Sequence, residues 1–263
     1  MSAGHRVVGL IGGSGVYDPG LFTPTARHKV STPWGPPSGP IQEGRVGPLR
    51  VFFLSRHGGG HAIPAHRVNY RANVDALVQL GVDTILSVSS VGSLRDELKP
   101  GDFVLPTQFV DFTKLRPTTF YDGGKTYHVS MADPFCPQLH EQMAAAGQTT
   151  GTPFHRGKTY VCVEGPRFST RAESRFFRGF ADIIGMTLVP EITLARERAL
   201  CYGLLAMVTD YDVWAERPVD AHEIVRVMQE NVVRMQKVVG ALLPRLDAPR
   251  TCDCSHVLDT AGI

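Results

Sequence analysis

Two carboxylates, Asp210 and Asp212, stand two residues apart directly after an uncharged run over residues 200–208. This run is too short to span a bilayer and predicts a buried strand. Open α/β sheets bind ligands at this end of a strand, and an extended chain would direct both carboxylates to the same side. Two acids at one pocket edge can act together, one holding a proton while the other accepts hydrogen bonds. The alternative is a pair of turn-forming aspartates that only terminate the strand.

Possible donors to an anion follow other expected strands. Converging backbone N–H groups of glycines, hydroxyl groups and a guanidinium that can bind two oxygens at once all suit a phosphate. The donors are Ser14 after residues 7–11, Arg56 and His57 after residues 49–54, Ser89 and Ser90 in a turn after residues 82–88, and Thr187 after residues 182–185.

Each of these signals also has a purely structural interpretation. The glycine-rich turn around Ser14 is not a dinucleotide fingerprint, because Asp18 takes the place of the third glycine, and no Gly-Lys-Ser/Thr follows as in a P-loop. A tight strand-to-loop turn would look the same. Arg56 could form a structural salt bridge, and His57 could be an ordinary loop residue.

A second group of residues suits a flat, hydrogen-bonding heterocycle such as a purine. Phe168 offers an aromatic surface and Met186 a soft apolar contact, and Asp210 and Asp212 offer carboxylates. A phosphate site beside a base site indicates either nucleotide binding or phosphorolysis of a nucleoside.

Strand–turn–helix units must position these side chains, which predicts an α/β chain. No internal repeat or linker separates them, so we expect one domain over residues 1–263, with a core of about 7–243 and a C-terminal tail of 244–263. Further strands are expected over 102–111 and 159–163, a hairpin over 41–47, and helices over 64–80, 134–146, from 190 onward and over about 219–243.

Composition limits the function classes. The 263 residues are 43% hydrophobic and 20% charged, with a net charge of +2. Without a long basic run, nucleic acid is not an expected partner. The first residues lack the apolar segment of a signal peptide, and no membrane segment is expected, so we predict a cytoplasmic protein.

Five cysteines are present. Cys136, Cys162 and Cys201 lie in apolar stretches and are expected to be buried thiols. Cys252 and Cys254, near His256, form at best half of a metal site, because no second Cys or His pair flanks them in the sequence. A tail thiol pair, or a disulfide between these two residues, is therefore favoured over zinc, and no metal ligand is assigned.

Several short motifs extend over nearly the whole chain. The most specific are Glu-Gly-Pro-Arg-Phe from residue 164 and Thr-Asp-Tyr-Asp from residue 209. With the others, they resemble the purine nucleoside phosphorylase family, and in particular its 5′-methylthioadenosine phosphorylase branch. The matching stretches are residues 12–15, 32–38, 56–58, 68–73, 91–94, 100–102, 134–136, 164–173, 185–187, 189–191 and 209–214.

The resemblance implies a single α/β domain with a mixed, partly barrel-like central sheet flanked by helices, assembled as a homotrimer or a hexamer. It implies no cofactor, with inorganic phosphate as co-substrate. Phosphate would be held by Ser14, Arg56, His57, Ser89, Ser90 and Thr187. The nucleoside would contact Phe168, Met186, Asp210 and Asp212, and His128 would reach the 5′ pocket of a neighbouring subunit.

The resemblance also implies the reaction, phosphorolysis of a purine nucleoside with Asp210 as general acid at N7. An Asp at 210, where 6-oxopurine enzymes carry Asn, favours a 6-aminopurine. Ser169 and Ala221 would face the 5′ substituent, and Ala221 leaves room for adenosine or 5′-deoxyadenosine. The alternatives are a broader purine nucleoside phosphorylase, a nucleosidase that uses water, and a binding protein without activity.

Overall fold

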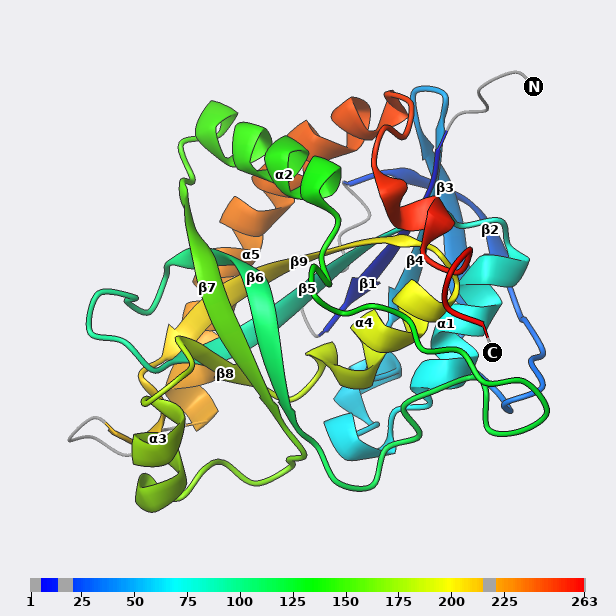
Figure 1. The fold of residues 1–263 in the computed structure, drawn as a ribbon. Coiled ribbons are helices and arrows are strands. Elements are labelled where there is room, and N and C mark those ends of the chain that lie inside the picture. Colours follow the sequence, from blue (N-terminus) through cyan, green and yellow to red (C-terminus); the bar gives the residue numbers. More distant parts are fainter. Residues whose placement is uncertain (1–5, 14–20, 215–220, 263) are drawn as a thin grey trace.

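The computed structural model describes residues 6–13, 21–214 and 221–262 (Figure 1). Ser14 lies outside these ranges. Nine strands form one sheet in the order β2-β3-β4-β1-β5-β8-β7-β6-β9. They are β1 (Val7–Gly12), β2 (Thr23–His28), β3 (Ile41–Val46), β4 (Leu49–Ser55), β5 (Thr84–Ser93), β6 (Phe103–Phe112), β7 (Phe154–Val163), β8 (Ile183–Gly185) and β9 (Cys201–Asp210).

A second pairing closes part of this sheet into a barrel. β5 pairs with β8 along one edge and with β9 along the other edge. The pairs β9–β6, β6–β7 and β7–β8 close the barrel. β5 also pairs in parallel with β1, which begins the open part of the sheet. The expected mixed, partly barrel-like α/β sheet is therefore confirmed, with β5 shared by its barrel and its open part.

Helices cover both faces of the sheet. Figure 1 shows α2 with α5 on one side and α1 with α4 on the other. Two large apolar cores result, one containing residues of α1 and α4 and the other containing residues of α2, α5 and the C-terminal segment. A smaller third cluster contains Phe177 of α3. The helices are α1 (Tyr70–Gln79), α2 (Pro137–Thr149), α3 (Arg171–Phe177), α4 (Leu188–Glu197) and α5 (Ala221–Leu242). In the described ranges, none of them is long and apolar enough to cross a membrane.

Burial explains the long uncharged run before Asp210. All nine residues of β9 that precede Asp210 are buried, because β9 has neighbours on both edges and is covered on both faces. Such a strand needs apolar side chains at every position rather than at alternate ones. The run thus carries Asp210 from the apolar interior to the edge of the barrel.

Two local expectations were wrong. Ser89 and Ser90 do not form a turn after the third predicted strand, because β5 continues through both residues to Ser93. Likewise, the chain is not extended from Asp210 to Asp212: Asp212 has φ 49° and begins a short 3-10 helix. The backbones of small polar residues form the hydrogen bonds of a sheet as well as those of apolar residues do. A strand end predicted from polar residue types alone can therefore be misplaced.

Candidate active site

A cavity of about 630 Å³ lies along the second half of β5. This volume is in the range of about 300–1,000 Å³ that small-molecule sites occupy. Ten residues predicted from the sequence line it, although they come from five separate stretches of chain. They are Arg56, His57, Ser89, Ser90, Phe168, Ser169, Met186, Thr187, Asp210 and Asp212.

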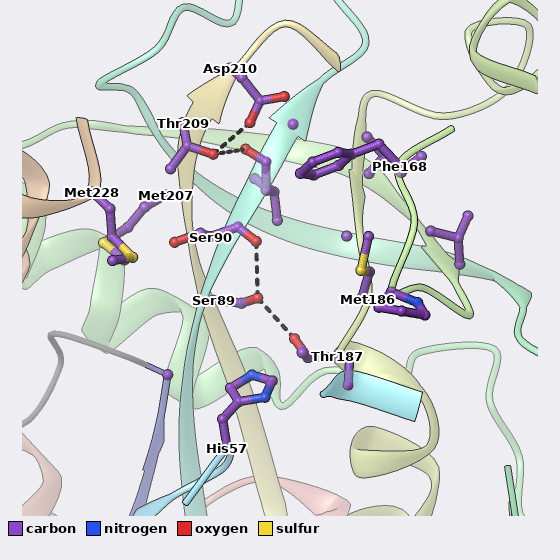
Figure 2. Close-up of a pocket in the computed structure, with 18 of the residues that line it drawn as sticks. His57, Ser89, Ser90, Phe168, Met186, Thr187, Met207, Thr209, Asp210 and Met228 are labelled. Atoms are coloured by element: carbon purple, nitrogen blue, oxygen red, sulfur yellow. Dashed lines mark hydrogen bonds between the residues drawn. The ribbon is translucent and has the colours of Figure 1, made fainter. Parts of the chain in front are cut away.

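One end of the cavity carries hydroxyl groups. The Ser89 and Thr187 hydroxyls lie 2.9 Å apart, and Ser89 Oγ also donates to the carbonyl oxygen of Ser90 (Figure 2). Thr187 directly precedes α4 but does not cap it with its side chain. Its hydroxyl is therefore directed to Ser89 and the cavity, where it can bind an oxyanion.

The Arg56 side chain is almost fully buried behind this end. Its guanidinium makes four hydrogen bonds: two to Glu191 (2.7 and 3.0 Å), one to Ser87 Oγ and one to the Val88 carbonyl. A guanidinium has five N–H groups, so one N–H on Nη1 remains for a ligand. To bind two phosphate oxygens at once, as expected from the sequence, Arg56 would have to break its ion pair with Glu191. The structural salt bridge that the sequence left open as an alternative is present.

His57 is held as a neutral ring. Burial and the nearby Arg56 charge lower the pKa of His57 to about 4. Its Nδ1 lies 2.8 Å from the Ile63 carbonyl oxygen, which can only accept, so Nδ1 carries the proton. Nε2 is then an acceptor, and it suits the P–OH group of a singly or doubly protonated phosphate better than a bare phosphate oxygen.

The opposite end of the cavity carries the two carboxylates. Asp210 accepts hydrogen bonds from the Thr209 hydroxyl (2.7 Å) and the Asp212 backbone N–H (2.9 Å). Asp212 is 4% exposed, and burial together with the Asp210 charge raises its pKa. Among the described residues, Asp212 Oδ2 is buried without a hydrogen-bond partner. The two carboxylates thus lie close enough for the negative charge of one to favour a proton on the other.

Phe168 and Met186 lie on the same side of the cavity, between its two ends (Figure 2). A Cβ on Gly165, which has φ 67°, would lie 2.5 Å from Met186 Sδ, so only glycine lets this loop approach the thioether. Arg116 fixes the same loop by donating to the Glu164 carboxylate (3.0 Å) and carbonyl (2.7 Å). A flat ring could lie against Phe168 while Met186 contacts an attached sugar.

Three predicted residues are not placed in the cavity. His128 is exposed and does not line it. Ser14 lies outside the described residues, and nothing is described of the Ala221 side chain, although Ala221 begins α5. All three roles stay predictions.

Sequence reasoning missed part of the lining. Met207 of β9 and Met228 of α5 lie together on the side facing Phe168 and Met186 (Figure 2). Met228 was included only in the apolar stripe of the last helix, and Met207 only in the buried strand. Helical and strand patterns indicate that such residues are covered, but not whether protein or a ligand covers them.

Comparisons with known proteins agree with this geometry. The sequence profile of the Phosphorylase superfamily matches residues 7–244. S-methyl-5′-thioadenosine phosphorylase of Thermofilum pendens is 54% identical over 257 residues, which are 97% of this chain and 98% of that protein. A methylthioadenosine phosphorylase structure from an Antarctic soil metagenomic library has a TM-score of 0.93 and 41% identity, covering 99% of this chain and 93% of that one.

A further solved structure is a double mutant of an adenosine/methylthioadenosine phosphorylase from Schistosoma mansoni in complex with adenine. It has a TM-score of 0.89 and 37% identity, and the match covers 93% of each chain. The match of the superfamily profile spans nearly the whole domain and includes every described cavity residue. The chain belongs to the Phosphorylase superfamily.

Proposed function

We propose that the protein catalyses phosphorolysis of S-methyl-5′-thioadenosine to adenine and 5-methylthioribose 1-phosphate, as a pentosyltransferase of purine and methionine salvage. The observation that carries this proposal is a single cavity with two chemically different ends. Ser89 and Thr187 offer hydroxyls to a phosphate at one end, and Asp210 and Asp212 offer carboxylates to a purine at the other. Relatives of that activity match over nearly their full length.

Phosphate is the nucleophile in this mechanism. Held by Ser89, Ser90, Thr187 and the remaining Arg56 N–H, with Ser14 as a further predicted donor, it lies beneath C1′ of the ribose. As the C1′–N9 bond breaks, positive charge develops on the ribose, and the phosphate charge stabilises it. The neutral His57 accepts a hydrogen bond from the P–OH group, which directs the ionised oxygens to the ribose.

The carboxylate pair assists the leaving group. Adenine departs readily only when N7 gains a proton, and Asp210 is our candidate donor, supported by Asp212 beside it. The unpartnered Oδ2 of Asp212 accepts from the 6-amino group. Such general acid catalysis contributes roughly 10²–10⁴-fold. No metal or organic cofactor takes part in any step.

Methionines favour the methylthio substituent. Met207 and Met228 give the cavity an apolar, polarisable wall opposite Met186. A thioether loses little on leaving water for such a wall, whereas a 5′-hydroxyl loses its hydrogen bonds to water without replacement. Ser169, the one hydroxyl predicted at the 5′ end, is the candidate contact for the 5′-hydroxyl of the alternative substrate adenosine. For 5′-deoxyadenosine, which has no 5′-hydroxyl, the argument is only the room that Ala221 is predicted to leave.

Initial rates on methylthioadenosine, adenosine and inosine, each with and without phosphate, test the proposal. We expect phosphate-dependent release of adenine, fastest from methylthioadenosine. Preference for inosine would refute the role of Asp210 and Asp212 in selecting a 6-amino group. Cleavage without phosphate would indicate a nucleosidase, and binding without turnover a silent nucleoside-binding protein.

Assembly and location stay predictions. A homotrimer, or a hexamer of two trimers, would bring His128 of one subunit to the 5′ end of the next. Light scattering at several protein concentrations measures the assembly, and a His128→Ala variant with unchanged KM for methylthioadenosine would remove His128 from the site. The cytoplasm is the expected compartment.

A further inference from the structure

Four of the five cysteines meet at the start of β9, whereas Asp210, at the end of β9, lines the nucleoside cavity. The Sγ atoms of Cys136, Cys201, Cys252 and Cys254 all lie within 4.8 Å of one another, and none of the four lines the cavity. The sequence suggested that no second pair of ligands flanks the Cys-Asp-Cys motif. In space that is wrong, because Cys136 and Cys201 supply the second pair from positions far away in the chain.

Three separate elements hold these side chains. Cys136 is the N-cap of α2, where its sulfur accepts from the Leu139 N–H, and Cys201 is the first residue of β9. Cys252 and Cys254 lie at the start of a short 3-10 helix in the C-terminal segment. Cys136, Cys201 and Cys254 are at most 3% exposed, so fixed secondary structure and burial restrict the sulfurs to one small volume.

The spacing of the sulfurs suits a single tetrahedral ion. Zn–S bonds of about 2.3 Å in a tetrahedral site place thiolate sulfurs about 3.8 Å apart. Cys201 and Cys252 are 3.3 Å apart, and no pair exceeds 4.8 Å. Small side-chain rotations would therefore bring all four sulfurs to one ion. Two disulfides would need only two close pairs, not mutual proximity of all four residues.

Positive charge lies next to the cluster. Arg196 Nη1 is 4.0 Å from Cys254 Sγ, and the Arg250 guanidinium lies beside Cys201 and Cys252. Arg250 Nε is buried and has no hydrogen-bond partner among the described residues. Four thiolates around Zn²⁺ carry a net charge of −2, which two guanidinium groups compensate, and N–H donors to ligand sulfurs are typical around such sites.

We propose that Cys136, Cys201, Cys252 and Cys254 bind one Zn²⁺ as a four-thiolate structural site that joins the C-terminal segment to α2 and β9. Each thiol loses one proton to solvent on binding, so binding strengthens as pH rises. All four positions are filled by protein, which leaves no place for water or substrate and makes the site structural rather than catalytic.

The test begins with protein purified and kept fully reduced without added metal, then titrated with Zn²⁺ or with Co²⁺ as a spectroscopic probe. We expect one Zn²⁺ per chain by elemental mass spectrometry. Co²⁺ should give the thiolate charge-transfer absorption and the intense visible bands of a tetrahedral complex. Addition of Zn²⁺ should also protect four thiols from a thiol reagent and raise the thermal midpoint of the reduced protein.

Variants locate the ion. Cys252→Ser and Cys254→Ser should each lower the Zn²⁺ affinity by at least tenfold and remove the cobalt spectrum. Cys162→Ala is the matched control, because Cys162 is the one cysteine outside the cluster, and it should retain both. Arg250→Met should weaken binding about 10–100-fold, as loss of an outer hydrogen-bond partner does.

Three results would overturn the proposal. The first is reduced wild-type protein that takes up no Zn²⁺ and gives no tetrahedral cobalt spectrum. The second is metal that both serine variants retain. The third is an intact mass lower by two or four hydrogens in thiol-containing buffer, because that shows disulfides where free ligands are required. The wild-type cobalt spectrum decides the matter even if the variants do not fold.

Discussion

Ser89 Oγ and Thr187 Oγ1 lie 2.9 Å apart, although 98 residues separate them in the chain. β5 and the start of α4 each supply one hydroxyl, so the oxyanion end forms only when both elements are in place.

Thr187→Val removes one hydroxyl at nearly constant volume. We expect the KM for phosphate to rise about tenfold, the loss of roughly one hydrogen bond to a charged ligand, with the KM for the nucleoside nearly unchanged. Steady-state kinetics with each substrate varied in turn measures both values, and Thr25→Val, at an exposed position on β2, is the control.

The carboxylate pair should act on turnover rather than on phosphate. Asp210→Asn and Asp212→Asn each keep the shape of the side chain but remove a carboxylate. We expect the variant that loses the proton donor to show a kcat about 10²–10⁴-fold lower, with a KM for phosphate close to that of the wild type. The other variant should mainly raise the KM for methylthioadenosine. Wild-type turnover in Asp210→Asn would exclude Asp210 as the acid.

Gly92, which has no side chain, leaves the space that the Asp210 carboxylate occupies. A Cβ at Gly92 would lie 3.0 Å from Asp210 Oδ2 and 3.1 Å from Ile184 Cγ2. Gly92→Ala should therefore displace the carboxylate and lower kcat by at least tenfold, while phosphate binding is retained. Gly240→Ala, on the exposed face of α5 with no atom within 4 Å of the added Cβ, is the matched control. If both variants turn over alike, the contact has no functional role.

The Arg56–Glu191 pair should matter for folding as well as for phosphate. Both side chains are at most 1% exposed, and Ser87 and Tyr202 complete the hydrogen bonds of Glu191. Glu191→Gln leaves the Arg56 charge buried without a counter-charge, and we expect a loss of about 3–5 kcal/mol of unfolding free energy. Urea denaturation measures it. Asp96→Asn, which breaks the ion pair between the exposed Asp96 and Arg178, should cost less than about 1 kcal/mol.

Acid should destabilise the fold through a histidine outside the cavity. Burial, reinforced by the charge of Arg156, lowers the pKa of His140 to about 4. Because the ordinary pKa is about 6.5, the unfolded chain binds the proton more readily, and stability present above pH 6.5 is lost as pH falls toward 4. His57, with its pKa also lowered to about 4, acts in the same direction.

This histidine can be tested by replacement. Between pH 7 and pH 5, His140→Gln should lose about 2 kcal/mol less unfolding free energy than the wild type, from the difference between the two pKa values. Urea denaturation at the two pH values gives both numbers. Equal pH dependence in wild type and His140→Gln would contradict the assignment.

Ten of the cavity residues were predicted from the sequence. Nine of them were singled out by their residue types, whereas Ser169 and the partly barrel-like sheet were expected only from the resemblance to a known family. Asp210 and Thr187 follow apolar runs that can only be strands, and their polar types stand out there. Contacts between residues far apart in the chain could not be predicted from the sequence. The partner of Arg56 is Glu191, 135 residues away, and no local pattern indicates such a pair.

Periodic signals had a different limit. They placed Met228 on the buried face of a helix but could not show that a cavity lies over it. They also missed β2, which carries Pro24 and charged residues at the edge of the sheet, where pairing on one side is sufficient. Cys136 and Cys201 were assigned correctly as buried thiols. Their proximity to Cys252 and Cys254 could be seen only in the structure.

β5 carries both functional ends of the cavity on one rigid strand. Ser89 lies at the oxyanion end and Gly92 contacts Asp210, three residues further on, a span of roughly 10 Å at about 3.3 Å per residue. Because β5 is paired along both edges, this span cannot lengthen or shorten. The strand therefore fixes the distance between the base site and the oxyanion site, and only a single sugar fits between them. Compounds with a longer spacer would bind at one end only and remain uncleaved.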